Sequence, residues 1–376
     1  MRKLVYSAVA LTLVSVPGFA NDNEWSSLDQ EINNLSSSLS AQNPAGPKLG
    51  GYIRTSFRYA TDEDALFGGP PNDESEVGFK LDKVRIEVSG DLGQDYSYKV
   101  SFDLATGTAV LKDAYVSWKM AETVKGTIGN FKKPFLRSAM INDKNLLFQE
   151  RTALGGFFDA RESGLMFSGS FDTIEWWIAG QNGAHDDGTD FIPNSKIGGD
   201  MNYTARIAAN LMGSGVGKVE GAYGAGEETN LSVGLSYQDD QFLDDGTAIG
   251  VDAALTAGPF SISAELVDFD NGTSDSFPSK TGKDLHWGSD NTFVSTDPSD
   301  STPWDATLSY MFTDMYEAAL RYEAADDDAD TTAWTAGVNR YVQGHDIKWT
   351  LQVLHTDSDD TTNEIDEWTL GLTVGI

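Results

Sequence analysis

Basic residues recur at alternate positions in the first third of the chain, opposite apolar neighbours. Arg54 and Arg58, for example, alternate with Ile53 and Phe57. Because successive side chains of an extended strand point to opposite faces, such cations share one face of a strand. A row of fixed cations on a polar face attracts anions electrostatically. The basic residues with this parity are Arg54, Arg58, Lys83, Arg85, Lys99, Lys119 and Lys125.

An ordinary polar face is the alternative interpretation of these cations. The acidic residues Glu87, Asp103 and Asp113 fall in the same segments and could neutralise some of them. A second basic group then follows in a stretch without alternation, from Gly129-Asn-Phe-Lys-Lys-Pro-Phe135 onwards. Its members are Lys132, Lys133, Arg137, Arg151 and Arg161.

The chain offers no constellation for catalysis. It has no nucleophile elbow, no glycine pattern for phosphates or dinucleotides and no metalloprotease helix motif. It contains no cysteine, and its four histidines are scattered. We expect no enzymatic activity, no cofactor and no metal centre. The acidic run 326–330 lacks the glycine and glutamate of a calcium loop, so we expect a solvated charge run, with weak divalent-cation bridging to lipopolysaccharide as the alternative.

The elements that must position the basic residues are strands. From Gly50 onwards, segments of about ten residues alternate apolar and polar side chains, with aromatic residues at the ends of the apolar face. Small polar residues fill the other face, which is typical of a membrane β-barrel with a watery lumen. Sixteen strands are expected, at 50–60, 79–90, 94–105, 110–120, 123–132, 162–171, 173–181, 201–211, 229–239, 247–257, 259–269, 304–312, 315–324, 332–342, 345–356 and 365–376.

The connections between these strands alternate between short and long, as expected for periplasmic turns and extracellular loops. The glycine-rich stretch 213–228 is ambiguous, because it could hold two further strands. Aromatic residues near the strand ends are candidates for the two interface girdles of a membrane barrel. They include Tyr59, Trp118, Tyr237, Trp304, Tyr322, Trp334 and Trp368.

The N-terminal residues resemble targeting and assembly segments. Arg2 and Lys3, an apolar run and Gly18-Phe19-Ala20 predict a signal peptide over residues 1–20, cleaved after Ala20. Residues 21–48 are predicted to form a short periplasmic heptad segment and a linker. The apolar heptad positions are Trp25, Leu28, Ile32, Leu35 and Leu39. Two heptads need partner chains for stability, so a homotrimer fits, whereas a disordered tail is the alternative.

Charge is distributed unevenly along the chain, whose formal net charge is −32. Between Lys48 and Arg161, 16 basic residues balance 16 acidic ones, whereas 8 basic residues face 38 acidic ones from Glu162 to Ile376. This acidic balance argues against binding to nucleic acid, which requires a basic field. The uneven distribution predicts that the basic residues of the first third serve a function, and that the rest of the chain presents an acidic face.

The segment around the second basic group resembles the phosphate-selective porin O and P family. The resemblance rests on Asp113-Ala114-Tyr115, the Gly-x-Phe-Lys-x-Pro-Phe segment, the pair Glu150-Arg151, and Arg161-x-x-Gly164. It implies a trimeric barrel of sixteen strands that is narrowed by the loop between Lys133 and Arg161. In that family basic residues line the path. The resemblance therefore implies that Lys132, Lys133, Arg137, Arg151 and Arg161 are pore-facing or anchor the loop.

We therefore expect an all-β, sixteen-stranded antiparallel transmembrane barrel over residues 49–376, with a constriction loop. It would lie in the cell outer membrane, in contact with lipid and lipopolysaccharide. The expected function is passive diffusion of small hydrophilic solutes, favouring anions such as phosphate. Two alternatives stay open: a general porin whose acidic vestibule favours cations, and a closed structural or adhesive surface barrel.

Overall fold

The computed structural model describes residues 46–60, 76–182, 201–240, 246–270, 300–326, 330–359 and 366–376. Residues Leu49–Ile376 form one unit. Its strands make a single antiparallel sheet that closes into a barrel, because the first strand, β1 (Lys48–Ala60), pairs with both β2 (Glu76–Leu92) and β17 (Asp366–Gly375). The predicted signal peptide and the heptad positions lie outside the described residues, so both stay predictions.

The barrel has sixteen strand positions, as the alternation predicts. The two-residue β12 (Asp300–Ser301) and the longer β13 (Trp304–Thr313) both pair with β11 (Phe260–Asp270). Thr302 and Pro303 separate them, and proline has no N–H to donate to the ladder. No observed strand end differs from its predicted position by more than three residues. The strands are β1 (Lys48–Ala60), β2 (Glu76–Leu92), β3 (Tyr96–Asp103), β4 (Val110–Ala121), β5 (Val124–Lys132), β6 (Arg161–Phe171), β7 (Ile174–Gln181), β8 (Asn202–Met212), β9 (Thr229–Asp240), β10 (Gly246–Ala257), β11 (Phe260–Asp270), β12 (Asp300–Ser301), β13 (Trp304–Thr313), β14 (Tyr316–Ala324), β15 (Thr332–Gln343), β16 (Ile347–Asp357) and β17 (Asp366–Gly375).

The two faces of the sheet are inverted relative to a water-soluble protein. In β17, Trp368 and Leu370 are exposed on the outer face, whereas Glu367, Thr369 and Thr373 are buried on the inner face. Exposed apolar side chains are stable only against an apolar medium, and buried polar ones need hydrogen-bond partners. The outer face therefore suits lipid and the inner face suits a polar lumen, as predicted.

Aromatic residues gather on the outer face near both ends of the strands. Tyr59 pairs across strands with Trp368, and Tyr322 pairs with Trp334. All four side chains are exposed, and all four lie at the end of the barrel with the long connections. Trp118 lies near the opposite end, where it packs edge-on against Phe167. The positions agree with the predicted girdles.

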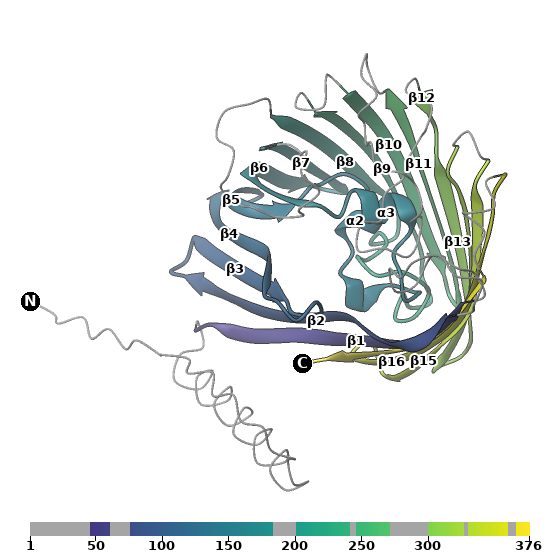
Figure 1. Cartoon of the computed structure of the whole chain (residues 1–376). Coiled ribbons are helices and arrows are strands. Elements are labelled where there is room, and N and C mark those ends of the chain that lie inside the picture. Colours follow the sequence, from purple (N-terminus) through teal and green to yellow (C-terminus); the bar gives the residue numbers. More distant parts are fainter. Residues whose placement is uncertain are drawn as a thin grey trace, which may run out of the picture. The chain divides into compact units, whose positions relative to one another are not determined.

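Two segments fold into the barrel from opposite ends. Residues 133–160 connect β5 to β6 at the end with the long connections, and they contain α2 (Arg137–Met140), the 3-10 helix η1 (Asp143–Asn145) and α3 (Ala153–Phe157). Figure 1 shows α2 and α3 inside the ring of strands. Among the described residues, no helix is long and apolar enough to cross a membrane.

The second inserted segment, residues 213–228, connects β8 to β9 at the end with the tight turns. The sequence left open that it holds two further strands, and this alternative is wrong: it contains no strand. Five of its glycines have positive φ, a backbone conformation that interrupts an extended strand. They are Gly213, Gly215, Gly221, Gly224 and Gly226.

Candidate functional site: the constriction loop and the lumen

Apolar side chains seat the 133–160 loop against the inner wall. Phe135 stacks on Phe158 with ring centroids 3.9 Å apart, and Phe158 stacks on Phe269 of β11. Leu136 and Leu154 are buried in the same cluster. Fully burying each of these side chains stabilises the loop by about 1.5–3 kcal/mol. The loop therefore lies on β10 and β11 because the polar lumen holds an apolar patch there.

Gly250 of β10 makes this close approach possible. A Cβ atom at position 250 would lie 2.7 Å from Cε1 of Phe135 and 3.0 Å from Cδ2 of Leu136. Any side chain at position 250 would therefore push the loop away from the wall.

Acidic residues on the inner wall accept hydrogen bonds from the loop backbone. The Glu265 carboxylate accepts from the backbone N–H of Ser138 at 2.8 Å and from its hydroxyl. The Glu323 carboxylate accepts from the N–H of Ala153 at 2.7 Å. The first N–H groups of a helix have no partner within the helix, and these carboxylates satisfy them in α2 and α3. Part of the acidic excess after Glu162 therefore holds the loop.

Basic residues on the inner wall donate to the loop carbonyls. Arg54 donates to the carbonyl of Phe148 at 3.0 Å, and Arg321 donates to the carbonyl of Glu150 at the same distance. Lys348 donates to the carbonyl of Leu146. Arg54 has the predicted inward orientation, but its guanidinium holds the loop.

Arg58 is the most deeply enclosed of the predicted cations, with no exposed surface. Its guanidinium pairs with Asp82 at 2.6 Å, with Glu367 at 3.5 Å and with the loop residue Glu150. Burial alone would raise the pKa of the Glu150 carboxyl, but Arg58 and Arg54 outweigh burial and lower it. Arg58 thus fixes the loop to β1 through an ionised carboxylate.

Arg151 holds the loop together from within. Its guanidinium donates to the carbonyl of Ile141 at 2.9 Å and to the carbonyl of Ser138, and it pairs with Asp143. Burial would raise the pKa of Asp143, but Arg151 and the other nearby cations together outweigh burial and hold that pKa well below its usual range. The side chain joins the α2 part of the loop to the part that precedes α3.

The remaining basic residues of the second group fix the ends of the loop. Lys132 donates to the carbonyl of Ala139 at 2.8 Å and pairs with Asp159. Lys133 is buried and pairs with Glu162 at 2.7 Å. Two further anchors are Arg161, which pairs with Asp113 at 2.9 Å, and Arg137, which donates to the carbonyl of Val219 at 2.8 Å.

A cavity of about 220 Å³ separates the loop from the wall of β1 to β6. Arg85 lines it, with one guanidinium nitrogen 3.4 Å from the Asp103 carboxylate and 3.8 Å from that of Asp143. Lys99 also lines it and pairs with Glu87 at 3.0 Å and with Asp113 at 3.5 Å. Its charged lining comprises five cations and three carboxylates: Arg85, Lys99, Lys125, Lys132, Arg161, Glu87, Asp113 and Asp143.

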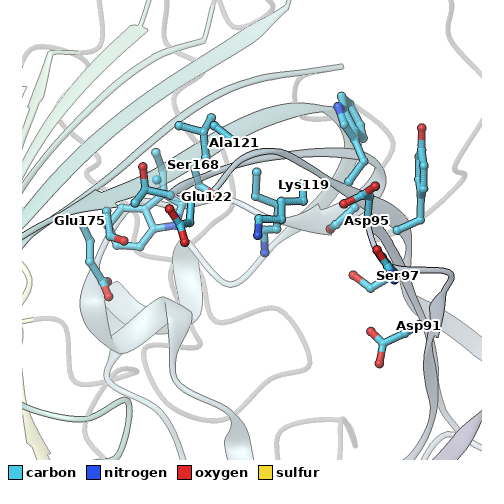
Figure 2. Close-up of a pocket in the computed structure, with 18 of the residues that line it drawn as sticks. Asp91, Asp95, Ser97, Lys119, Ala121, Glu122, Ser168 and Glu175 are labelled. Atoms are coloured by element: carbon cyan, nitrogen blue, oxygen red, sulfur yellow. The ribbon is translucent and has the colours of Figure 1, made fainter. Parts of the chain in front are cut away.

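A second cavity, of about 430 Å³, opens towards the end with the tight turns. In Figure 2 the side chain of Lys119 lies between those of Glu122 and Asp95. Lys119 and Lys125 are cross-strand partners on β4 and β5, and both are exposed in this cavity. Among the described residues, Lys125 alone lines both cavities, and no carboxylate lies within 4.0 Å of its ammonium group.

The structure thus assigns two roles to the predicted cations. Most of them hold the loop, and two of these, Lys132 and Arg161, also line the cavity beside it. The other cations that line the cavities are Arg85, Lys99, Lys119 and Lys125. Lys83 is half-buried on β2 and acts electrostatically on Asp143. Sequence reasoning missed the wall residues that receive the loop, above all Glu265, Glu323 and Lys348. Their inward parity was visible in the sequence, but nothing in the pattern showed that their partners are backbone groups of the loop.

Comparisons with known proteins agree with this geometry. A family model described as phosphate-selective porin O and P matches residues 53–286. OprB of Pseudomonas putida aligns with a TM-score of 0.59 and 9% identity, over 94% of this chain and 97% of that one. The outer membrane channel DcaP of Acinetobacter baumannii aligns with a TM-score of 0.54 and 14% identity, over 88% and 97%. A trimer form of OmpT from Vibrio cholerae aligns with a TM-score of 0.53 and 12% identity, over 88% of this chain and 99% of that one.

At these identities the structural likeness shows the fold alone. No curated protein matches the chain significantly in sequence.

Proposed function

Because the chain belongs to the phosphate-selective porin O and P family, an outer-membrane porin family, we propose that it passes small hydrophilic solutes with a preference for small anions, phosphate among them. Members of this family are channels rather than enzymes, which confirms the expectation of no catalysis. The proposed pathway runs between the constriction loop and the wall of β2 to β6, and continues through the cavity at the turn end.

The observation that carries the anion preference is the lining of the cavity beside the loop. Its five cations outnumber its three carboxylates, and one of these cations, Lys125, also lines the cavity at the turn end. Fixed charges act most strongly where the path is narrow, because low-dielectric walls focus their field. At about 4 Å, two unit charges interact by roughly 1 kcal/mol in water but about 4 kcal/mol at an effective dielectric constant near 20.

The acidic-vestibule alternative assumes that the acidic connections at the other end act in a wide, wet mouth. There the Debye length of about 8–10 Å at physiological salt damps their field. Several of these connections, such as 271–299 and 360–365, lie outside the described residues. The alternative of a cation-favouring vestibule therefore predicts a preference that is strongest at low salt.

Single-channel reversal potentials under a KCl gradient test the proposal. We expect modest anion preference at high salt, a weaker preference as the salt is lowered, and cation preference for Lys125→Glu. Arg340→Glu is the control, because it reverses one charge on an exposed residue of β15 that lines neither cavity. A wild-type pore that prefers cations at every salt concentration would support the acidic-vestibule alternative, and a barrel without current steps would support the closed one.

The assembly that we propose is a homotrimer in the outer membrane, surrounded by lipid and lipopolysaccharide. The exposed apolar outer face and its aromatic ends support contact with lipid. The fold shared with a trimer form of OmpT supports the trimer. The acidic run 326–330 lies partly outside the described residues, so divalent-cation bridging to lipopolysaccharide remains a proposal.

A further inference from the structure

The segment 213–228 leaves the barrel wall at the turn end and reaches the constriction loop. Each of the two segments donates hydrogen bonds to the other. The N–H of Glu220 donates to the carbonyl of Asn145 at 3.0 Å, and the Glu220 carboxylate accepts from the N–H of Leu147 at 2.8 Å. Arg137 of the loop donates to the carbonyls of Val219 and Gly217. The segment therefore holds the loop on the side away from the long connections.

The same segment is fixed to the opposite wall. The Glu220 carboxylate pairs with Arg321 of β14 at 3.3 Å. The N–H of Ala222 donates to Glu317 at 2.5 Å. Tyr223 stacks on Tyr341 of β15, with ring centroids 3.9 Å apart and an interplanar angle of 17°. Buried charge-assisted hydrogen bonds and a stacked pair resist displacement more than a solvated turn does.

Lys218 extends from this braced segment into the turn-end cavity. Its ammonium group lies 5.3 Å from the ring centroid of Trp177, within the range of a cation–π contact. It lines the cavity with Lys119 and Lys125. In the part of the chain that the structure describes, no carboxylate lies within 4.0 Å of the Lys218 ammonium group.

The charge balance of this cavity makes Lys218 important. Three lysines face four carboxylates, Asp91, Asp95, Glu122 and Glu175, so the loss of Lys218 would leave two lysines against four. Burial lowers the pKa of Lys218, Glu175 opposes that effect, and Lys125 adds to it. Because Lys218 and Lys125 line the same cavity, both can act on the same solute.

We propose that Lys218 is a specificity-determining cation for small anions on the turn side of the constriction, placed there by the inserted segment 213–228. An anion that passes Lys125 next meets Lys218, which offsets the surrounding carboxylates. The same segment sets the width of the pathway by bracing the loop. The inference rests on the proposed conduction of anions and adds a second selective position, which sequence alternation did not reveal.

The first test removes the charge. One unit charge at about 7 Å in water changes the local population of an ion about threefold, in opposite directions for chloride and potassium, so Lys218→Gln should lower the chloride-to-potassium permeability ratio roughly sevenfold. Block of the chloride current by inorganic phosphate added at the turn side should weaken by a similar factor, with the conductance step changed little. Arg340→Gln is the control, because it removes one positive charge from an exposed residue of β15 that lines neither cavity.

The second test displaces the segment without changing any charge. A Cβ atom at Gly221 would lie 2.6 Å from Oε1 of Glu317 and 2.9 Å from Cδ1 of Leu147, whereas one at Gly224 would meet nothing within 4 Å. Both glycines have positive φ, +87° and +77°, so alanine strains both backbones similarly. Gly221→Ala should therefore increase the open-channel noise and the step size, and Gly224→Ala should leave both unchanged.

The outcomes separate this inference from the proposed function. If Lys125→Glu reverses selectivity but Lys218→Gln keeps the wild-type permeability ratio and phosphate block, Lys218 has no selective role and the inference is overturned. If Gly221→Ala and Gly224→Ala give the same open-channel noise and step size, the segment 213–228 does not hold the loop in place. A wild-type barrel without current steps refutes the proposed conduction itself, and the inference with it.

Discussion

Replacement of Arg151 by methionine should release the constriction loop from its internal anchor. The guanidinium contacts two loop carbonyls and the Asp143 carboxylate, all of them buried. Removing one partner of a buried ion pair costs about 3–5 kcal/mol, because the other charge stays buried. Asp143 keeps Arg85 at 3.8 Å and the Tyr52 hydroxyl at 3.0 Å, so we expect the lower limit, about 3 kcal/mol.

This free energy converts into an observable population. At about 1.4 kcal/mol per tenfold change, about 3 kcal/mol raises the displaced fraction of the loop roughly a hundredfold. Single-channel recordings should show more frequent excursions to a larger conductance. The thermal midpoint of barrel unfolding should change little, because Arg151 takes no part in the strand ladder.

Two further variants check the cause. Arg151→Lys keeps the charge but loses the planar guanidinium group. The frequency of its excursions to a larger conductance should therefore lie between those of wild type and Arg151→Met. The double variant Arg151→Met with Asp143→Asn removes both charges and should show less open-channel noise than Arg151→Met alone. If Arg151→Met matches wild type in noise and in step size, the loop does not depend on this residue and the reasoning fails.

Two other predictions follow from the loop and from the assembly. Asp143, Asp159 and Glu150 have lowered pKa values, because the basic residues around each carboxyl together outweigh burial; the largest of these contributions comes from Arg151, Lys132 and Arg58 respectively. Their contribution to holding the loop therefore exists above the unfolded carboxyl pKa of about 4 and is lost as the pH falls through the lowered folded values. Channel noise should thus stay constant from pH 7 to about pH 4 and rise only below that, and a rise already near pH 5–6 would contradict this assignment. Unboiled protein should migrate in detergent gels as a species larger than the monomer and change its mobility on boiling, whereas identical mobility with and without boiling would argue against a stable trimeric barrel.

Strand positions were predictable because one physical rule repeats along the chain. Each strand must place apolar side chains outward and polar ones inward, so alternation fixes both its existence and its faces. Arg54 and Arg85 accordingly point inward as predicted. The function of an inward side chain was less predictable. Parity shows which face a residue occupies, and Arg54 and Lys99 share a face although one holds the loop and the other lines a cavity.

The segments inside the barrel could not be derived from alternation, since they have none. The loop's position depends on contacts distant in sequence, such as Phe158 on Phe269 and Ser138 on Glu265. The sequence left open that the segment 213–228 holds two further strands, which the structure shows to be wrong. Its dense glycines were the available signal, since they favour backbone conformations outside the extended region. The pore-lining roles of individual cations stay predictions until currents are measured.

Closure of the ring by β1 and β17 has a consequence for how the protein reaches its folded state. Tyr52 pairs with Gly375, and Ala60 pairs with Glu367, so this seam joins the first and the last strand of the barrel. Until it forms, both strands present rows of unpaired backbone groups, which can pair with another chain. Contacts this distant in sequence also form slowly. During assembly, closure of the seam therefore competes kinetically with aggregation. The yield of folded barrel depends more on the lifetime of the two unpaired edges than on the stability of the folded state.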